Sequence, residues 1–277
     1  MKTQSNDGIE LEYEVYGSGP LNVLFLHGWG NAANFWDDLL LHHLDLNGLR
    51  CITASYRGHG GSSAAAGGYN AEQFSRDMFA VADAAGADEL IVVGFSMAGK
   101  FAPAMAALAP SRVRAQVLIA PLGPDAVDIP DEVFEGWMEA AGDPARFRTI
   151  LAPFMIRPVE DRLLELYCGN VARATRHGMK GTSDMCARES LVELIRDVRI
   201  PTLVLAGEGD PLLPGSYIRE ELMPYFPNAR LVLLPCGHEI PYEMPKETGW
   251  LIEAFLAGQH TSQTNRQLES GVARAMS

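Results

Sequence analysis

Several kinds of site are missing from this sequence of 277 residues. Its four cysteines and seven histidines form neither a CxxC pair nor a pattern that is typical of a zinc site. No GxGxxG turn opens a helix after a strand and no P-loop is present, so the sequence indicates no dinucleotide or nucleotide site. We therefore expect no metal and no cofactor. The widely spaced cysteines favour reduced thiols in a cytoplasmic protein.

Basic residues are also scarce, since 22 lysines and arginines face 35 acidic residues and give a net charge of −13. A surface of this charge repels phosphate backbones and anionic lipids, so neither nucleic acid nor membrane is an expected partner. No apolar run reaches the length of a membrane span, and the first residues are polar. Hydrophobic residues still make up 47% of the chain, enough for the core of one large domain. The expected partner is a small-molecule substrate, and the oligomeric state stays open.

Short apolar runs alternate with helical patterns along the chain. Lys2–Ser5 and Ile9–Tyr16 flank Asn6-Asp7-Gly8, a sequence that is typical of a hairpin turn. Six more runs read as strands: Leu21–Leu26, Arg50–Ala54, Leu90–Val93, Ala115–Ala120, Thr202–Leu205 and Arg230–Leu234. Helical spacing predicts helices at Ala71–Ala85 and Met97–Ala109. A last helix is expected to open at Pro245, with an apolar stripe of Trp250, Leu251, Ala254 and Phe255.

This alternation predicts an α/β fold with a mostly parallel sheet of eight strands and helices on both faces. The first two strands or so are expected to be antiparallel. The alternation breaks between about Pro121 and Pro201, where helical patterns cover Asp131–Ala141, Glu160–Ala174 and Glu189–Asp197. We expect a core at residues 1–121 and 183–259, an inserted helical lid at 122–182, and a polar C-terminal tail at 260–277. Bulky apolar residues in the lid predict a largely apolar pocket between lid and core.

The segment Gly94-Phe95-Ser96-Met97-Ala98-Gly99 follows a predicted strand and opens a predicted helix. A serine on such a tight strand-to-helix turn presents its hydroxyl above the sheet, and the helix N-terminus favours developing negative charge. This context predicts Ser96 as a nucleophile; the alternative is a serine that only caps the helix. Ala98 stands where glycine is usual, and it is small enough for the turn to survive.

A serine nucleophile needs a histidine base and an acid that orients the imidazole. Directly after the last predicted strand comes His238, which we expect to be the base. The acid is expected at Asp210, after the strand Thr202–Leu205, with Asp125 as the alternative and Glu208 as a structural residue. The other histidines are expected to be structural (His27), part of a turn (His59), or on helix or tail surfaces (His42, His43, His177 and His260).

Two backbone amides must stabilise the oxyanion that forms during serine chemistry. One is expected from Met97, the residue after the nucleophile, and the other from Trp29 in the loop after Leu21–Leu26. The alternative for Trp29 is a purely structural core aromatic. Four lid arginines, Arg146, Arg148, Arg157 and Arg162, could bind a substrate carboxylate, but solvated surface positions are favoured.

Taken together, these stretches resemble the α/β-hydrolase superfamily, especially its small bacterial esterase, perhydrolase (cofactor-free haloperoxidase-like) and enol-lactone hydrolase branches. The resemblance rests on HGWGNAANFWDDL, SYRGHGGSS, GFSMAG, LVLAGEGDPLLP and GHEIPYEMP, which span most of the core from Leu21 to about Leu256. It is specific for the fold and the triad, and much less so for the substrate. Serine at position 96, in place of aspartate, argues against haloalkane dehalogenase chemistry. Tyr56 stands where many relatives have Asp, at a position that is usually structural.

These observations predict a cofactor-independent serine hydrolase. It is expected to cleave a carboxylic ester or lactone of a small to medium, largely apolar substrate through an acyl-enzyme. One alternative is hydrolysis of a carbon–carbon bond in a ring-cleavage product by the same triad. The other is a ligand-binding or signalling protein that keeps the fold without catalysis. Pure binding is disfavoured because every catalytic position holds a chemically competent residue.

Overall fold

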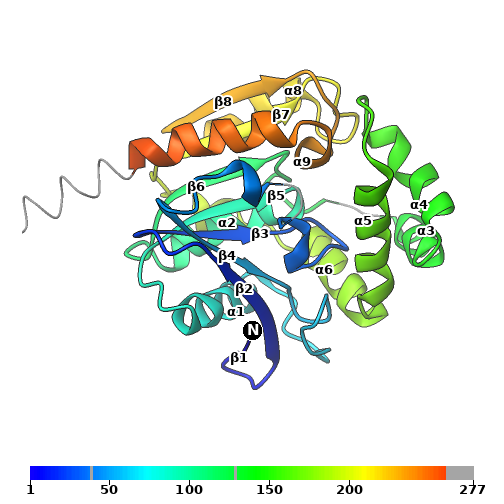
Figure 1. The fold of residues 1–277 in the computed structure, drawn as a ribbon, viewed down its shortest axis with the longest axis horizontal. Coiled ribbons are helices and arrows are strands. Elements are labelled where there is room, and N and C mark those ends of the chain that lie inside the picture. Colours follow the sequence, from blue (N-terminus) through cyan, green and yellow to red (C-terminus); the bar gives the residue numbers. More distant parts are fainter. Residues whose placement is uncertain (38–39, 128–129, 260–277) are drawn as a thin grey trace, which may run out of the picture.

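The computed structural model describes residues 1–37, 40–127 and 130–259. Eight strands form one sheet in the order β1-β2-β4-β3-β5-β6-β7-β8 (Figure 1). Strand β2 pairs antiparallel with β1 and with β4, and all other neighbouring strands are parallel. The strands are β1 Lys2–Gln4, β2 Glu10–Tyr16, β3 Leu21–Leu26, β4 Leu49–Ala54, β5 Leu90–Phe95, β6 Val113–Ile119, β7 Thr202–Gly207 and β8 Ala229–Leu234. The predicted α/β fold with a mostly parallel sheet of eight strands is confirmed.

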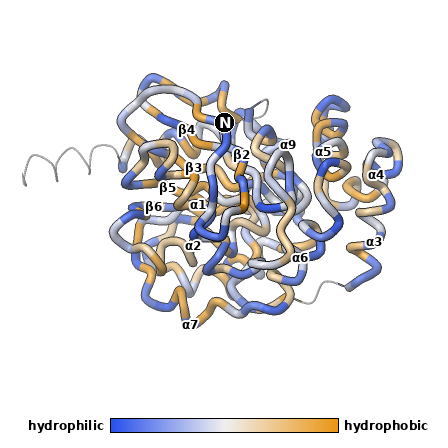
Figure 2. Tube along the Cα trace, turned by 90° about the horizontal axis from the view of Figure 1, so that it is seen from below, coloured by the Kyte–Doolittle hydropathy of each residue, from blue (hydrophilic) through white to orange (hydrophobic). Residues whose placement is uncertain are grey.

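The central strands are apolar on both sides because helices cover both faces of the sheet. Strand β3 shows the alternation: Val23 and Phe25 belong to one hydrophobic cluster, and Leu24 and Leu26 to the other. Hydrophobic residues recur along these strands in Figure 2. Helices α1 (Ala71–Ala84), α2 (Met97–Leu108) and α7 (Val192–Ile195) supply the second cluster. The first cluster is completed by the C-terminal helix and by the insertion between β6 and β7.

That insertion holds four longer helices, α3 Asp131–Ala140, α4 Pro144–Leu151, α5 Asp161–Arg173 and α6 Arg176–Arg188. They gather on one side of the sheet (Figure 1). The sequence patterns located α3 and α5 but gave no prediction for α4 or α6. Helix α6 contains Gly178 and Gly181, which weaken its helical pattern but are needed where it approaches Gly58 and the ring of Tyr69. The lid boundary that we expected at residue 182 falls inside α6, so the division into core and lid remains a proposal.

The chain also forms several short turns of helix. These are Ala33–Phe35, Leu41–His43, Ala152–Phe154, Met223–Tyr225, α8 Gly215–Tyr217, a π-turn at Ile218–Leu222, and α9 Ile240–Glu243. The helix expected at Glu189–Asp197 is shorter than predicted, since α7 covers only Val192–Ile195. The expected tail at 260–277, with His260, lies outside the described residues.

The C-terminal helix occupies residues 245–259 and begins at Pro245, as predicted. The predicted apolar stripe is correct only in part: Leu251 and Phe255 pack, half-buried, against the first hydrophobic cluster, but the fully buried side chains of this face are Thr248, Ile252 and Leu256. Trp250 lies off this face and is 54% exposed. Its ring is covered by Lys246, whose ammonium lies 4.7 Å from the ring centroid. The sequence analysis therefore assigned Trp250 to the buried face of the helix, whereas its side chain lies on the exposed face.

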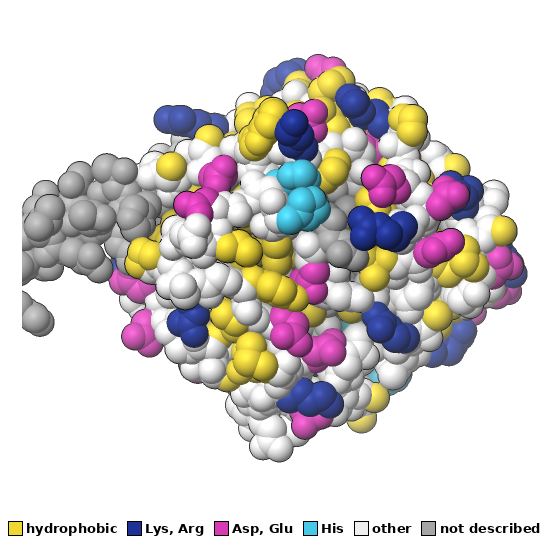
Figure 3. Space-filling view, in the orientation of Figure 1, with side chains coloured by type: hydrophobic (Ala, Val, Ile, Leu, Met, Phe, Trp, Pro, Cys, Tyr) yellow, Lys and Arg dark blue, Asp and Glu magenta, His cyan; other side chains and the backbone are white. Residues whose placement is uncertain are grey.

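Charged side chains of both signs are interspersed with hydrophobic ones on the face of the molecule that Figure 3 shows. Within the described part of the chain, no helix has both the length and the apolar character that crossing a membrane requires.

A buried ion pair ties the loop after β4 to helix α1. Arg57 donates to both carboxylate oxygens of Asp77 at 2.8 Å, and both side chains are almost fully buried. Asp77 also accepts hydrogen bonds from Ser5 and Gln73. Arg57 reaches a second carboxylate, Asp7, which is 38% exposed. Both charges are removed from water here, so removing one partner would leave the other charge buried and uncompensated, which destabilises the fold.

We predict that Asp77→Asn lowers the free energy of unfolding by about 3–5 kcal/mol, because it leaves the buried guanidinium without its matching charge. Asp7→Asn serves as the matched control, since an exposed partner contributes less than about 1 kcal/mol. Urea denaturation of both variants measures the difference. Equal losses in the two variants would contradict the assignment.

Candidate active site

Ser96 occupies the turn between β5 and α2, in a backbone conformation that side chains rarely adopt, with φ 52° and ψ −113°. The turn is held by the hydrogen bond from the Ser96 amide to the carbonyl of Ile119 at 2.8 Å. It also requires a glycine at position 94, because a Cβ there would lie 2.6 Å from the carbonyl oxygen of Ala98. Such strain persists only where the surrounding structure imposes it. The conformation of Ser96 at the end of β5 is therefore fixed by strand β6, through Ile119, and by helix α2, which packs closely against Gly94.

The ends of β7 and β8 bring the two other predicted residues together. A Cβ at Gly207 would lie 2.1 Å from the carbonyl oxygen of Gly237, so only glycine allows this close approach. Asp210 accepts a hydrogen bond from His238 Nδ1 at 2.7 Å through one carboxylate oxygen. Its other oxygen accepts from the amides of Leu212 and Leu213 at 2.8 and 3.0 Å.

The opposite nitrogen of the same imidazole faces the serine. His238 Nε2 lies 2.9 Å from Ser96 Oγ, and because Nδ1 donates to Asp210, Nε2 is left to accept the hydroxyl proton. The structure thus brings Ser96, His238 and Asp210 into one hydrogen-bonded chain. Asp210 and His238 are 3% and 4% exposed, so solvent and salt weaken their electrostatic interaction only slightly.

Burial and charge shape the titration of this chain. Burial lowers the pKa of His238, but the hydrogen bond and charge of Asp210, with the charges of Glu239 and Glu243, raise it above its usual value. Burial raises the pKa of Asp210, but the bond and charge of His238 and the two amides hold it below its usual value. The arrangement therefore keeps Asp210 ionised and stabilises a protonated imidazole.

The alternative acid Asp125, the nearby Glu208 and the structural histidine His27 do not belong to this hydrogen-bonded chain of side chains. Asp125 is exposed and accepts from the hydroxyl of Ser190 at 2.9 Å, while Glu208 is exposed beyond β7. His27 is fully buried, its ring stacks on Tyr56, and its Nε2 faces the Tyr56 amide at 3.4 Å. Burial holds the pKa of His27 well below its usual value, so this ring is neutral. The Tyr56 hydroxyl donates to the His27 carbonyl at 2.6 Å, which gives Tyr56 a structural role.

The remaining histidines lie elsewhere. His59 is buried in the turn after β4, and burial lowers its pKa to about 4. The rings of His42 and His43 contact each other at a tilted angle, with His42 exposed and His43 half-buried, and His177 packs against Tyr69 at the surface. Among the described residues, no three His, Cys, Asp or Glu side chains cluster in a way that could hold a metal ion.

The two predicted oxyanion donors both lie at this site. Helix α2 begins at Met97, so its amide has no partner within the helix. In the described part of the chain, the amide of Trp29 likewise donates to no protein group. The Trp29 ring is fixed by its Nε1 bond to the carbonyl of Met179 at 3.1 Å. It packs against Trp137, with the ring centroids 4.7 Å apart. Trp29 therefore combines a free amide with a side chain that is anchored in the lid.

Contacts from the lid to the catalytic loops escaped the sequence analysis. The Tyr167 hydroxyl of α5 donates to the Trp29 carbonyl at 3.0 Å, and Asn170 donates to Asn31 at 2.9 Å. The carbonyl of Phe154 accepts from the His238 amide at 2.7 Å. Since these partners are far apart in the sequence, no local pattern marks them.

A further set of hydrogen bonds joins the insertion to the loop that carries His238, which follows β8. The carboxylate of Glu243 accepts from the amides of Gly237, Ile156 and Arg157, with the shortest distance to each between 2.8 and 2.9 Å. GHEIPYEMP placed Glu243 next to the base in sequence, but its bonds to Ile156 and Arg157 could not be read from it. The insertion is thus bonded both to the Trp29 loop and to the His238 loop.

A cavity of about 160 Å³ opens above Ser96 and His238. Its wall is mostly apolar, as predicted, with Glu239 and Ser183 as additional polar residues. The apolar and aromatic lining consists of Trp29, Met97, Leu122, Val127, Val133, Trp137, Phe154, Tyr167, Cys186 and Leu212. The lid arginines are not among these lining residues, and Arg146 and Arg148 form exposed ion pairs with Glu139 and Asp161. The cavity fits a small apolar group next to the serine.

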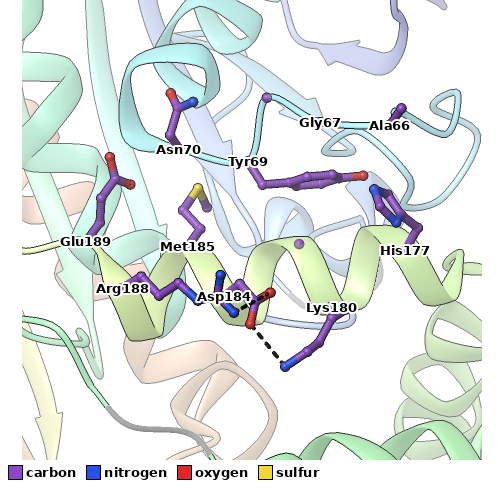
Figure 4. Close-up of a pocket in the computed structure, with 12 residues that line it drawn as sticks. Ala66, Gly67, Tyr69, Asn70, His177, Lys180, Asp184, Met185, Arg188 and Glu189 are labelled. Atoms are coloured by element: carbon purple, nitrogen blue, oxygen red, sulfur yellow. Dashed lines mark ion pairs between the residues drawn. The ribbon is translucent and has the colours of Figure 1, made fainter.

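A larger groove of about 440 Å³ lies on the other side of α6, against the loop around Tyr69. Figure 4 shows Tyr69 beside His177, and Lys180 and Arg188 both directed toward Asp184. These two cations pair with Asp184 at 3.0 and 3.4 Å. The groove contains no nucleophile with an adjacent base, so size alone does not locate the chemistry.

The architecture and these motifs can be compared with known proteins. A family model described as the alpha/beta hydrolase fold matches residues 22–245. A non-heme haloperoxidase from Rhodococcus erythropolis is 30% identical over 251 residues, which cover 83% of this chain and 89% of the relative. The esterase from Exiguobacterium antarcticum superposes with a TM-score of 0.82 at 23% identity, over 93% of this chain and 99% of that one. The enol-lactonase from Burkholderia xenovorans LB400 gives 0.79 at 20% identity, over 93% and 100%. The chain belongs to the α/β-hydrolase family, as its motifs predicted.

Proposed function

We propose that this protein is a serine hydrolase that cleaves a carboxylic ester or lactone through an acyl-enzyme. The hydrogen-bonded chain of Ser96, His238 and Asp210, with distances of 2.9 and 2.7 Å at the floor of a cavity, carries the proposal. The esterase and the enol-lactonase among the structural neighbours support this class of reaction. Its four cysteines are free and buried, which fits a reducing cytoplasm as its location.

In the first half of the reaction, Ser96 Oγ attacks the carbonyl carbon while His238 Nε2 takes the hydroxyl proton. Asp210 keeps the imidazole in the required tautomer and stabilises its protonated form. The negative charge on the carbonyl oxygen is held by the amides of Met97 and Trp29. When the tetrahedral intermediate collapses, the proton on His238 passes to the leaving alcohol, and Ser96 keeps the acyl group.

In the second half, water gives a proton to His238 and attacks the acyl-enzyme, which releases the acid and restores Ser96. Hydrogen peroxide in place of water would release a peracid from the same intermediate. That reaction relates the proposal to the haloperoxidase name of one relative without any added cofactor. The volume of the cavity, about 160 Å³, favours small acyl groups.

Ser96→Ala tests the proposal directly. We expect turnover of p-nitrophenyl acetate to fall by at least about a thousandfold, because the nucleophile is lost while the oxyanion donors remain. The unfolding temperature should stay close to that of the parent. Ser75→Ala, which changes a buried serine of α1, is the matched control and should keep full turnover. Near-normal hydrolysis by a folded Ser96→Ala protein would end the proposal.

The raised pKa of His238 fixes the pH dependence. The imidazole must be neutral to accept the serine proton, so kcat/KM should fall as the pH drops through a midpoint above 6.5, the unperturbed pKa of histidine. Asp210→Asn should move this midpoint to lower pH, since it removes the charge that favours the protonated form. Profiles of kcat/KM between pH 5 and 9 measure both values. A midpoint that stays in place in the variant argues against Asp210 as the acid.

Tyr167 is proposed as a positioning residue because its hydroxyl holds the carbonyl of Trp29. Tyr167→Phe keeps the ring, so KM should be nearly unchanged while kcat falls about three- to tenfold, the range expected for one neutral hydrogen bond. Affinity for a boronic acid that mimics the tetrahedral intermediate should fall in parallel with kcat. Tyr69→Phe, which removes a hydroxyl bonded to Ala65 at the outer groove, is the control. A raised KM with unchanged kcat would show that Tyr167 only lines the pocket.

A further inference from the structure

The carboxyl group of Glu239 has no task in the reaction as described. Glu239 directly follows His238, is 3% exposed, and lines the same cavity as Ser96 and His238. Its Oε2 atom is buried and has no hydrogen-bond partner among the described residues. The contrast with Glu243 is direct, because that carboxylate accepts from three backbone amides.

Two buried phenols, Tyr167 and Tyr242, lie close to Glu239. A hydrogen bond from the Asn31 side chain is among the causes that lower the pKa of both, so their hydroxyls have a polar neighbour that Glu239 lacks in the described part of the chain. Tyr242 stacks on Tyr167 at a centroid distance of 5.6 Å, and after burial the charge of Glu239 is the next cause that raises the pKa of each phenol. A polar group without a partner is costly to bury, so the carboxyl group of Glu239, which lines the cavity, favours a hydrogen-bond donor that enters through it.

The charges that face Glu239 define which group this is. Burial raises the pKa of Glu239, the charge of His238 lowers it, and the charges of Glu243 and Asp210 raise it, so that together they bring it to about 7. The two tyrosine hydroxyls are the other titratable groups near it. An anionic substrate group would meet three carboxyl groups here. An O–H or N–H donor would instead supply the missing hydrogen bond in a cavity whose other walls are mostly apolar.

We propose that Glu239 binds a hydroxyl or ammonium group carried by the acyl part of the substrate close to the reacting carbonyl. The inference rests on the proposed serine hydrolase function and narrows its substrate class to hydroxyacyl or aminoacyl esters and lactones. The short range follows from position, because Glu239 directly follows His238 and lines the same cavity of about 160 Å³ as Ser96. Since Glu239 and Ser96 both adjoin His238 in it, the donor belongs on carbon 2 or carbon 3 of the acyl chain.

Two sets of phenyl esters test the position and the chemistry of the donor. The first set is 2-methylpropanoate, 2-hydroxypropanoate and 2-aminopropanoate, which differ only in a methyl, hydroxyl or ammonium group. The second set is 3-methylbutanoate, 3-hydroxybutanoate and 3-aminobutanoate. Release of phenol is followed at pH 8, where Glu239 is mostly ionised, and spontaneous hydrolysis is subtracted. For every ester, kcat/KM of a variant is divided by that of the parent, which cancels the intrinsic reactivity of the ester.

Three variants separate the possible roles of the side chain. In Glu239→Leu, we expect this quotient to fall about ten- to a hundredfold further for the hydroxy and amino esters of one set than for the matching alkyl ester, as for a lost hydrogen bond to a charged group. Glu239→Gln keeps an acceptor oxygen, so the loss should be small for the hydroxy ester and large for the amino ester. Glu189→Gln changes a carboxyl group in the outer groove, away from the cavity, and should leave all quotients alike.

The outcomes distinguish this inference from the proposed function. Turnover of p-nitrophenyl acetate that depends on Ser96, together with equal quotients for all three esters of both sets, overturns the role of Glu239 alone. The same holds if the parent hydrolyses p-nitrophenyl acetate but none of the hydroxy or amino esters. Absence of Ser96-dependent turnover overturns the serine hydrolase function, and this inference with it. A selective loss in either set supports the assignment and locates the donor on carbon 2 or carbon 3.

Discussion

The hydrogen bond between His238 and Asp210 is the interaction on which the rest of the site depends. The bond determines which imidazole nitrogen faces Ser96. Together with the negative charge of Asp210, it raises the pKa of His238 despite the burial of the ring. The bond exists only because β7 and β8 end side by side, with Gly207 against the backbone of Gly237. Two glycines and the parallel register of the sheet thus set the distance between acid and base. The strained turn at Ser96 supplies the third member from the far side of β6.

Three carboxyl groups surround one imidazole, and their different partners give them different roles. Asp210 is bonded to the ring and to two amides, so it is held as an anion. Glu243 is bonded to three amides and fastens the lid to the histidine loop. Glu239, with its buried oxygen unpartnered, is the one whose protonation the surroundings leave near neutral pH. Sites often divide tasks in this way, because the environment rather than the residue type sets the pKa.

The sequence sufficed for what depends on strand ends. Ser96, Asp210 and His238 each follow an apolar run, and parallel strands bring such positions to one edge of the sheet. Features that depend on distant partners were out of reach. Tyr167 and Trp29 are 138 residues apart, and nothing near either residue indicates their bond. Trp250 misled for a related reason, since apolarity locates a buried face only when neighbouring polar chains such as Lys246 do not cover the ring at the surface.

The bonds from the insertion to both catalytic loops have a consequence for access. If α5 and the segment around Phe154 moved away from the core as one rigid body, the Trp29 carbonyl would lose its bond from Tyr167. The His238 amide would lose its bond to the Phe154 carbonyl. An open state of that kind would lose the arrangement of Ser96, His238 and Trp29 that the proposed hydrolysis requires. Entry past the half-exposed side chains of Val133 and Leu212, at the rim of the cavity, leaves those bonds intact. In the proposed reaction, these bonds would therefore couple the exclusion of bulk solvent from the cavity to the geometry that cleavage requires.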